Sequence, residues 1–130
     1  MKKLIVSLLL LSAICSVVYA AKISTEWQAP TMNIEGTANS ILSKLDKSLF
    51  LTDKQKPKLL PIISRYLQQK IALQPLQHSN ETAYKTKVNS MQHGLQTKLK
   101  ALLTPTQYTE FMGLKPKTYD ETNVLSQLYY

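Results

Sequence analysis

The stretch LTDKQ at residues 51–55 recurs as LTPTQ at residues 103–107, so the chain carries the pattern L-T-x-x-Q twice. This spacing is that of a capping box: the Thr side chain accepts a hydrogen bond from the amide three residues later, and the Gln side chain reaches back to the Thr amide. Each copy therefore predicts the start of a helix. The Leu of the second copy can pack on Tyr108, whereas that of the first has only the alkyl stem of Lys56. The residues assigned to the two helix starts are Leu51, Thr52, Gln55, Leu103, Thr104 and Gln107.

The two copies begin 52 positions apart, at residues 51 and 103, and an apolar pair follows each at the same offset. These pairs are Leu59-Leu60 and Phe111-Met112. The repetition indicates an imperfect duplication of one unit, a helix followed by a capped helix. The alternative is a coincidence between two amphipathic helix starts.

Apolar residues at helical spacing predict an all-α protein of about four helices. The two long helices in the middle are joined by a short loop at 75–79, which predicts an antiparallel hairpin as the frame of the fold. Pro57 and Pro61 lie inside the second helix and predict a bend, because each removes a ladder hydrogen bond. The alternative is that this helix begins later, near Pro61. The expected helices are 40–49, 52–74, 81–102 and 104–112.

Residues with strong end preferences support these boundaries. Ser40 and Asn80 are good N-caps for the first and third helices. The second helix is expected to stop before Pro75, since the residue preceding a proline disfavours helical geometry. Gly113 is placed to close the fourth helix as a left-handed C′ residue.

The N-terminal 20 residues are typical of an export signal, with Lys2 and Lys3 before an apolar run and cleavage after Ala20. A lipoprotein signal at Cys15 is the alternative, although Ile14 stands where a lipobox has a small residue. We therefore expect a periplasmic or secreted protein. The expected divisions are a signal at 1–20, an irregular N-terminal lead at 21–39, a helical domain at 40–114 and a C-terminal tail at 115–130.

The charge of the chain is unevenly distributed. The formal net charge is +8, and residues 44–117 hold thirteen basic and four acidic residues, a balance of +9. A basic segment of this kind favours acidic polypeptides, anionic lipid or nucleic acid as partners. Nucleic acid is not expected, because no recognition motif is present and export argues against it.

The side chains of the chain do not form a recognisable catalytic set. The acidic residues do not pair on one helix face, and the only cysteine, Cys15, lies in the predicted signal, so the mature chain lacks a thiol nucleophile. His78 in the expected loop and His93 on the third helix are too few for a zinc site, which needs more nitrogen or sulfur ligands at short spacing. We expect no enzymatic activity, no metal site and no cofactor.

The paired L-T-x-x-Q boxes, together with the export signal and the basic helical body, resemble the Spy/CpxP-like periplasmic proteins over roughly residues 42–114. The resemblance implies a hairpin-built protomer, a curved antiparallel homodimer, and a role as an ATP-independent chaperone or as a regulator of envelope-stress sensors. It also implies that the six motif residues act as helix starts. Pro57, Pro61 and the aromatic tail depart from the family pattern.

The expected function is that of an exported holdase-like or envelope-stress binding protein whose partners are unfolded or acidic polypeptides. Lys54, Lys58 and Arg65 recur at helical spacing away from the apolar face of the second helix, and they are the candidate client-binding rim. That apolar face is expected to supply the adjacent hydrophobic surface. The alternative is a structural or membrane-surface-binding helical envelope protein without chaperone activity, since basic amphipathic helices also bind anionic lipid.

Overall fold

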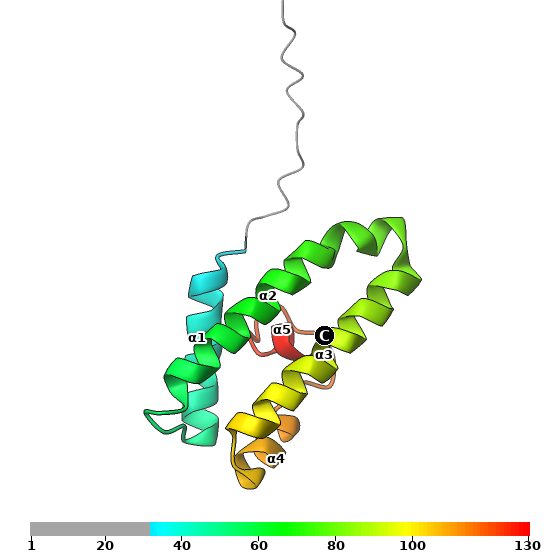
Figure 1. Ribbon diagram of the computed structural model, residues 1–130. Helices are drawn as coiled ribbons and strands as arrows, with labels where there is room; N and C mark the ends of the chain where they lie inside the picture. Colours follow the sequence, from blue (N-terminus) through cyan, green and yellow to red (C-terminus); the bar gives the residue numbers. More distant parts are fainter. Residues whose placement is uncertain (1–31) are drawn as a thin grey trace, which may run out of the picture. The chain divides into compact units, whose positions relative to one another are not determined.

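The computed structural model describes residues 32–130, and within that range every regular element is a helix. The all-α prediction is confirmed (Figure 1). The predicted signal and most of the predicted N-terminal lead lie outside the described residues. The helices are α1 Ile34–Leu49, α2 Lys56–Ser79, α3 Glu81–Leu102, α4 Pro105–Gly113 and α5 Ser126–Tyr129.

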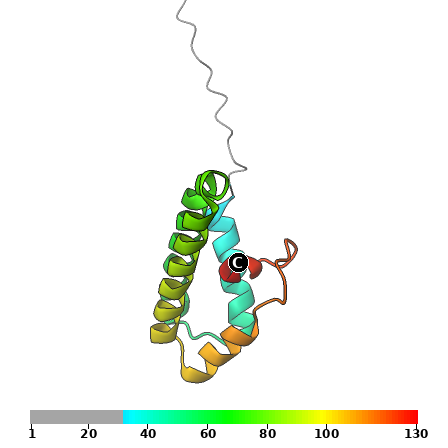
Figure 2. The same ribbon diagram turned by 90° about the vertical axis from the view of Figure 1, so that its right-hand side faces the viewer.

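The frame of the fold is the antiparallel hairpin of α2 and α3 (Figure 1). α1 and the short α5 pack on one face of this hairpin, as the second view shows (Figure 2). α4 closes the end of the hairpin opposite the α2–α3 turn, where it contacts α1 and α3. One face of the hairpin is therefore covered by the other helices, and we call the opposite face the outer face.

α1 begins six residues earlier than predicted, so the irregular lead expected at 21–39 is wrong for its last part. Asn33 rather than Ser40 is the N-cap, and its Oδ1 accepts a hydrogen bond from the Gly36 amide over 2.9 Å. The buried stripe of α1 starts at Ala38, one turn before Ile41. An apolar stripe and an equally good capping residue were therefore both available upstream of Ser40.

α2 does not start at Thr52 as predicted. The residues after Thr52 form a turn, in which the amides of Gln55 and Lys56 bond to the Thr52 carbonyl over 3.0 and 3.2 Å, and regular helix begins at Lys56. Pro57 explains the shift, because it has no N–H to continue a ladder begun at Thr52. In the observed helix Pro57 lies within the first two positions, where an N–H would have no partner within the helix.

The loop predicted at 75–79 is also wrong, because α2 runs through Pro75 to Ser79. Pro75 removes a single ladder bond, and the last turn is still closed by the Asn80 amide, which donates to the Leu76 carbonyl over 2.8 Å. Asn80 alone separates α2 from α3. Its Oδ1 accepts from the Ala83 amide over 3.0 Å, so the predicted N-cap of α3 is confirmed.

α4 follows its prediction at the start and departs from it at the end. Thr104 is the N-cap and both hydrogen bonds of the capping box form. Gly113 is the last helical residue and is not left-handed, so the predicted C′ glycine is wrong. The amide of Leu114, itself in right-handed geometry, bonds to the carbonyls of Glu110 and Phe111, which closes the helix without a left-handed residue.

The core is a single cluster to which all five helices contribute, and full burial of each large aliphatic side chain stabilises it by about 2 kcal/mol. The C-terminal tail takes part in this core. Its buried side chains are Leu125, Ser126, Leu128 and Tyr129.

Candidate functional site

The two L-T-x-x-Q motifs meet in the folded protein through the side-chain amides of their glutamines. Gln55 Nε2 donates to Gln107 Oε1 over 2.8 Å, and Gln107 Nε2 donates back to Gln55 Oε1 over 3.1 Å. We call this pair the glutamine clasp. It joins the start of α2 to the start of α4, which lie 52 residues apart in the chain.

Each amide of the clasp also bonds to backbone groups in equivalent ways. Gln55 Nε2 donates to the Leu102 carbonyl over 3.2 Å, and Gln107 Nε2 donates to the Leu49 carbonyl over 3.1 Å. Each Oε1 accepts in addition from the Thr amide of its own motif over 3.0 Å. A glutamine amide has two N–H donors and two acceptor lone pairs, so the hydrogen-bonding capacity of both side chains is used.

The clasp gives the motifs a role in addition to their local Thr–Gln hydrogen bonds, which cap a helix directly only at Thr104. The Leu residues of the two motifs are each 6% exposed and belong to the core, while Gln107 is a buried polar side chain. The nearly two-fold equivalence of the hydrogen bonds fits the duplication inferred from the sequence. The contact between the motifs was not predicted, although their shared Gln at the same offset was a signal for it.

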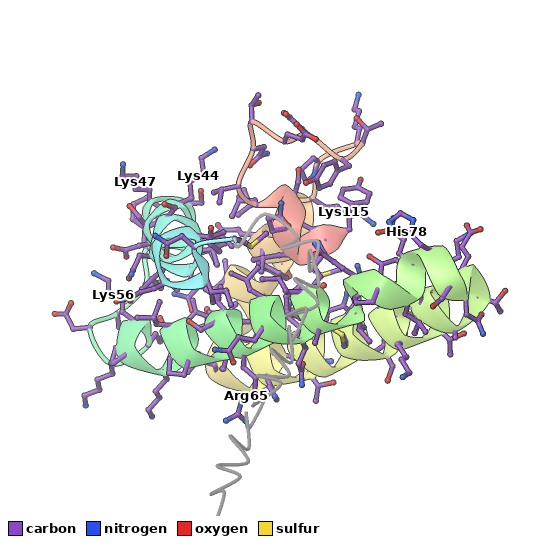
Figure 3. The ribbon with its side chains drawn as sticks, turned by 90° about the horizontal axis from the view of Figure 1, so that it is seen from above. Lys44, Lys47, Lys56, Arg65, His78 and Lys115 are labelled. Carbon is purple, nitrogen blue, oxygen red and sulfur yellow. The ribbon has the colours of Figure 1, made fainter. Side chains whose placement is uncertain are left out.

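The candidate rim residues are all exposed, but only two of them lie on a helix. Lys58 and Arg65 are on α2, seven residues apart and therefore on the same side. Lys54 lies in the turn before α2. In the view from above, Arg65 points away from the side that carries α1 with Lys44 and Lys47 (Figure 3).

A groove of about 260 Å³ runs between α2 and α3 beside Arg65. Arg65 and Lys98 supply positive charge to its walls, and Ile62 and Met91 supply apolar surface. A second hollow of about 350 Å³ shares Gln69, Ser90 and Met91 with the first and adds Lys87 and Leu73. The two hollows thus continue one another along the outer face. The residues that line them include no carboxylate.

Gly94 keeps this groove open. A Cβ built on Gly94 would meet no atom within 4 Å, so the floor of the groove has room beside the helix backbone. Lys87, Met91, Gly94 and Lys98 follow one another at spacings of four, three and four, and so lie along one side of α3. This spacing is present in the sequence, but Lys87 and Lys98 were not singled out from it.

The apolar face of α2 is not the open hydrophobic surface that was expected. Leu59, Ile63 and Leu67 are fully buried in the core, and the tail and α1 pack on α2. The apolar surface that α2 still contributes to the groove comes from the half-buried Ile62 and Leu73. Within the part of the chain that the structure describes, the most exposed large apolar side chain is instead Phe50, at 82%, which has a left-handed backbone with φ of 52°.

The structure also locates the two histidines. His78 lies in the last turn of α2 rather than in a loop, and His93 is exposed on α3. Among residues 32–130, His, Cys, Asp and Glu side chains do not gather in any group of three that could hold a metal ion. In the same range, no helix combines the length and the apolar character needed to cross a membrane.

Comparison with protein-family models, with curated proteins and with solved structures found no match to this chain.

Proposed function

We propose that this chain is an exported, ATP-independent, holdase-like protein that binds unfolded or acidic polypeptide on the outer face of the α2–α3 hairpin. The observation that carries the proposal is the groove beside Arg65. Its walls combine two cations with half-buried apolar side chains, and its lining lacks carboxylates. An acidic, partly unfolded segment matches this combination in both charge and hydrophobicity.

The two kinds of side chain have different tasks in the proposal. Lys54, Lys58 and Arg65 attract an acidic client over a distance that salt shortens to about 10 Å at 0.1 M. Ile62 and Met91 hold the client after contact, because their apolar surface is removed from water. Capture should therefore slow as salt rises, and release should depend on salt much less.

The resemblance to Spy/CpxP-like periplasmic proteins supplies the functional class. The all-α hairpin and the joined L-T-x-x-Q motifs are compatible with that class, and export and a curved antiparallel dimer belong to the proposal. The proposal involves no reaction and no cofactor.

The experiment is to replace Lys54, Lys58 and Arg65 together with Gln and to measure the association rate of a fluorescent, permanently unfolded acidic client. The matched control carries Lys44→Gln, Lys47→Gln and the same change at the exposed Lys117, and so loses the same charge elsewhere. We expect the first variant to associate at least about tenfold more slowly at low salt, and the control to stay within about twofold of the wild type. Equal rates for both variants would remove the three residues from the mechanism.

A second variant tests the groove without changing charge. Gly94→Leu adds a side chain where the backbone has open space, so the helix should tolerate it and the groove should be filled. Gly94→Ala, which adds a single carbon, is its control. Faster client release from Gly94→Leu alone supports the proposal. Unchanged release, or binding by the wild type to anionic vesicles without binding to the client, would favour the membrane-surface alternative.

A further inference from the structure

The C-terminal tail contacts the covered face of the hairpin through a short anchor, residues 125–130. Leu125, Leu128 and Tyr129 of the anchor are 5%, 2% and 7% exposed. The Tyr129 ring stacks on Phe111 of α4 at a centroid distance of 5.1 Å, and its hydroxyl donates to the Phe111 carbonyl. We call the surface under the anchor the cradle. It includes Lys70 on α2, Gln92 and Leu95 on α3, and Phe111 on α4.

The polar contacts of the cradle are mainly to the backbone of the anchor. Lys70 Nζ donates to the carbonyls of Gln127, over 3.0 Å, and of Tyr130. Gln92 Nε2 donates to the Tyr129 carbonyl over 3.0 Å. These carbonyls belong to the last turn of a four-residue helix, where backbone acceptors lack partners within the helix. Any peptide that ends a helical turn at this place would offer the same acceptors, whatever its side chains.

The anchor does not fill the cradle completely. A space of about 60 Å³ remains beside Leu128 and Tyr129, enough for more than one water-sized group. Its walls come from Gln92, Leu95, Gln96, Phe111, Met112 and Lys115.

The anchor is also joined to α4 by a segment that has few buried contacts. Residues 117–122 are all exposed and lie in turns or irregular backbone (Figure 2). Segments with little burial open at a lower free energy than the core. Because this segment is itself not buried, its movement with a released anchor would not require the hairpin to unfold.

We propose that the cradle is a second binding site for polypeptide, that the anchor occupies it in the free protein, and that an aliphatic–aromatic client segment displaces the anchor. The anchor contains two Leu and two Tyr residues, which indicates that the cradle binds segments rich in aliphatic and aromatic side chains. This inference deepens the proposed function and rests on it for the identity of the client. The site differs from the groove, since it lies on the opposite face of the hairpin and binds uncharged residues.

The first test uses a peptide that copies residues 123–130, capped at both ends so that no terminal charge contributes. Hydrogen exchange is followed on the full exported chain. The amides of Gln127, Leu128 and Tyr130 bond within the tail, to the carbonyls of Val124, Leu125 and Ser126, so their exchange reports release of the anchor. We expect excess peptide to accelerate exchange at these amides at least about tenfold, while α3 stays protected. Unchanged exchange at saturating peptide would overturn the proposal.

The second test weakens the anchor with Leu125→Ser and Leu128→Ser and measures binding of the labelled peptide. The apparent affinity of the cradle for the peptide is reduced in proportion to the fraction of molecules in which the anchor has left it. The variant should therefore bind the peptide at least about tenfold more tightly than the wild type. A peptide with the same two Leu→Ser changes is the control and should bind neither protein. Equal affinity of the wild type and the variant for the peptide would contradict occupancy of the cradle by the anchor. Dissociation of a dimer by the peptide would contradict it too, because a second copy of the chain would then be the occupant.

These readouts separate the inference from the proposed function. Peptide binding and displacement without any protection of unfolded clients would leave the cradle as a site and remove the holdase role. The opposite outcome is that the peptide does not displace the anchor and that Lys70→Met protects clients as well as the wild type does. That outcome would retain the holdase role and remove the cradle as a binding site.

Discussion

Breaking the glutamine clasp should show that the two motifs act as a pair. The Gln107 side chain makes four close hydrogen bonds: two with Gln55, one from the Thr104 amide and one to the Leu49 carbonyl. At about 1 kcal/mol net for each bond, Gln107→Ala should lower the free energy of unfolding by about 3–4 kcal/mol. Gln55→Ala should cost slightly less, because Gln55 is only partly buried. Two of the lost bonds are shared by both variants.

The double variant should therefore be more stable than the sum of the single changes predicts, by about 2 kcal/mol. The assay is urea unfolding at constant temperature of the wild type, both single variants and the double variant. Gln68→Ala, at an exposed position on α2, is the matched control and should stay within about 0.5 kcal/mol of the wild type. Additivity of the two single changes within about 0.5 kcal/mol would refute the reasoning, because independent sites behave in that way.

Gln107→Glu adds a test by pH. It keeps the size of the side chain but replaces the N–H donors with an oxygen that faces the Leu49 carbonyl and the Gln55 amide. Burial should raise the pKa of the new carboxyl above its value in the unfolded chain. The variant should therefore be least stable near neutral pH and recover stability relative to the wild type as pH falls. A stability deficit of the variant that is the same at acidic and at neutral pH would contradict burial of this carboxyl group.

Four further substitutions test other parts of the structure by thermal or denaturant unfolding. Thr52→Ala and Thr104→Ala should each cost about 1 kcal/mol through loss of the capping bond, and unfolding at the wild-type midpoint with an unchanged slope would contradict the capping roles. Phe50→Gly should raise stability by about 1 kcal/mol, because the left-handed backbone disfavours a residue with a Cβ and the ring is largely exposed; a loss of stability would show that the ring packs in solution. Burial lowers the pKa of Lys70 to about 8, below its ordinary value of 10.5. The wild type should therefore gain stability relative to Lys70→Met as pH rises from about 8 to 10.5. Parallel profiles of unfolding free energy against pH for the two proteins would contradict this.

The sequence predicted the fold class because the signals for it are local. Capping residues and apolar spacing located α3 and α4 to within about one residue, and the antiparallel hairpin followed from them. The boundaries of α1 and α2 failed where two local preferences competed. Pro57 moves the start of α2 from Thr52 to Lys56, and α2 continues for about one turn beyond Pro75.

The candidate site was less accessible from sequence, because its contacts are between distant segments. The exposure of Lys58 and Arg65 could be predicted from their spacing relative to the buried Leu59 and Ile63, whereas Lys54 is exposed in the turn before α2. The clasp, the groove partners on α3 and the cradle under the tail depend on how α2, α3 and α4 pack. Periodicity assigns a residue to a face of its own helix, but it does not say which other helix that face meets.

Light scattering of an unfolding client in the presence of the purified chain, without nucleotide, tests the central claim most directly. We expect the chain to suppress scattering near equal molar amounts of client. Raising salt from about 20 mM to about 300 mM should slow the onset of suppression more than it lowers its final extent, because salt screens the charges that capture the client and not the apolar contacts that hold it. Scattering that proceeds as it does without the chain, for both an acidic and an uncharged client, would contradict the holdase role.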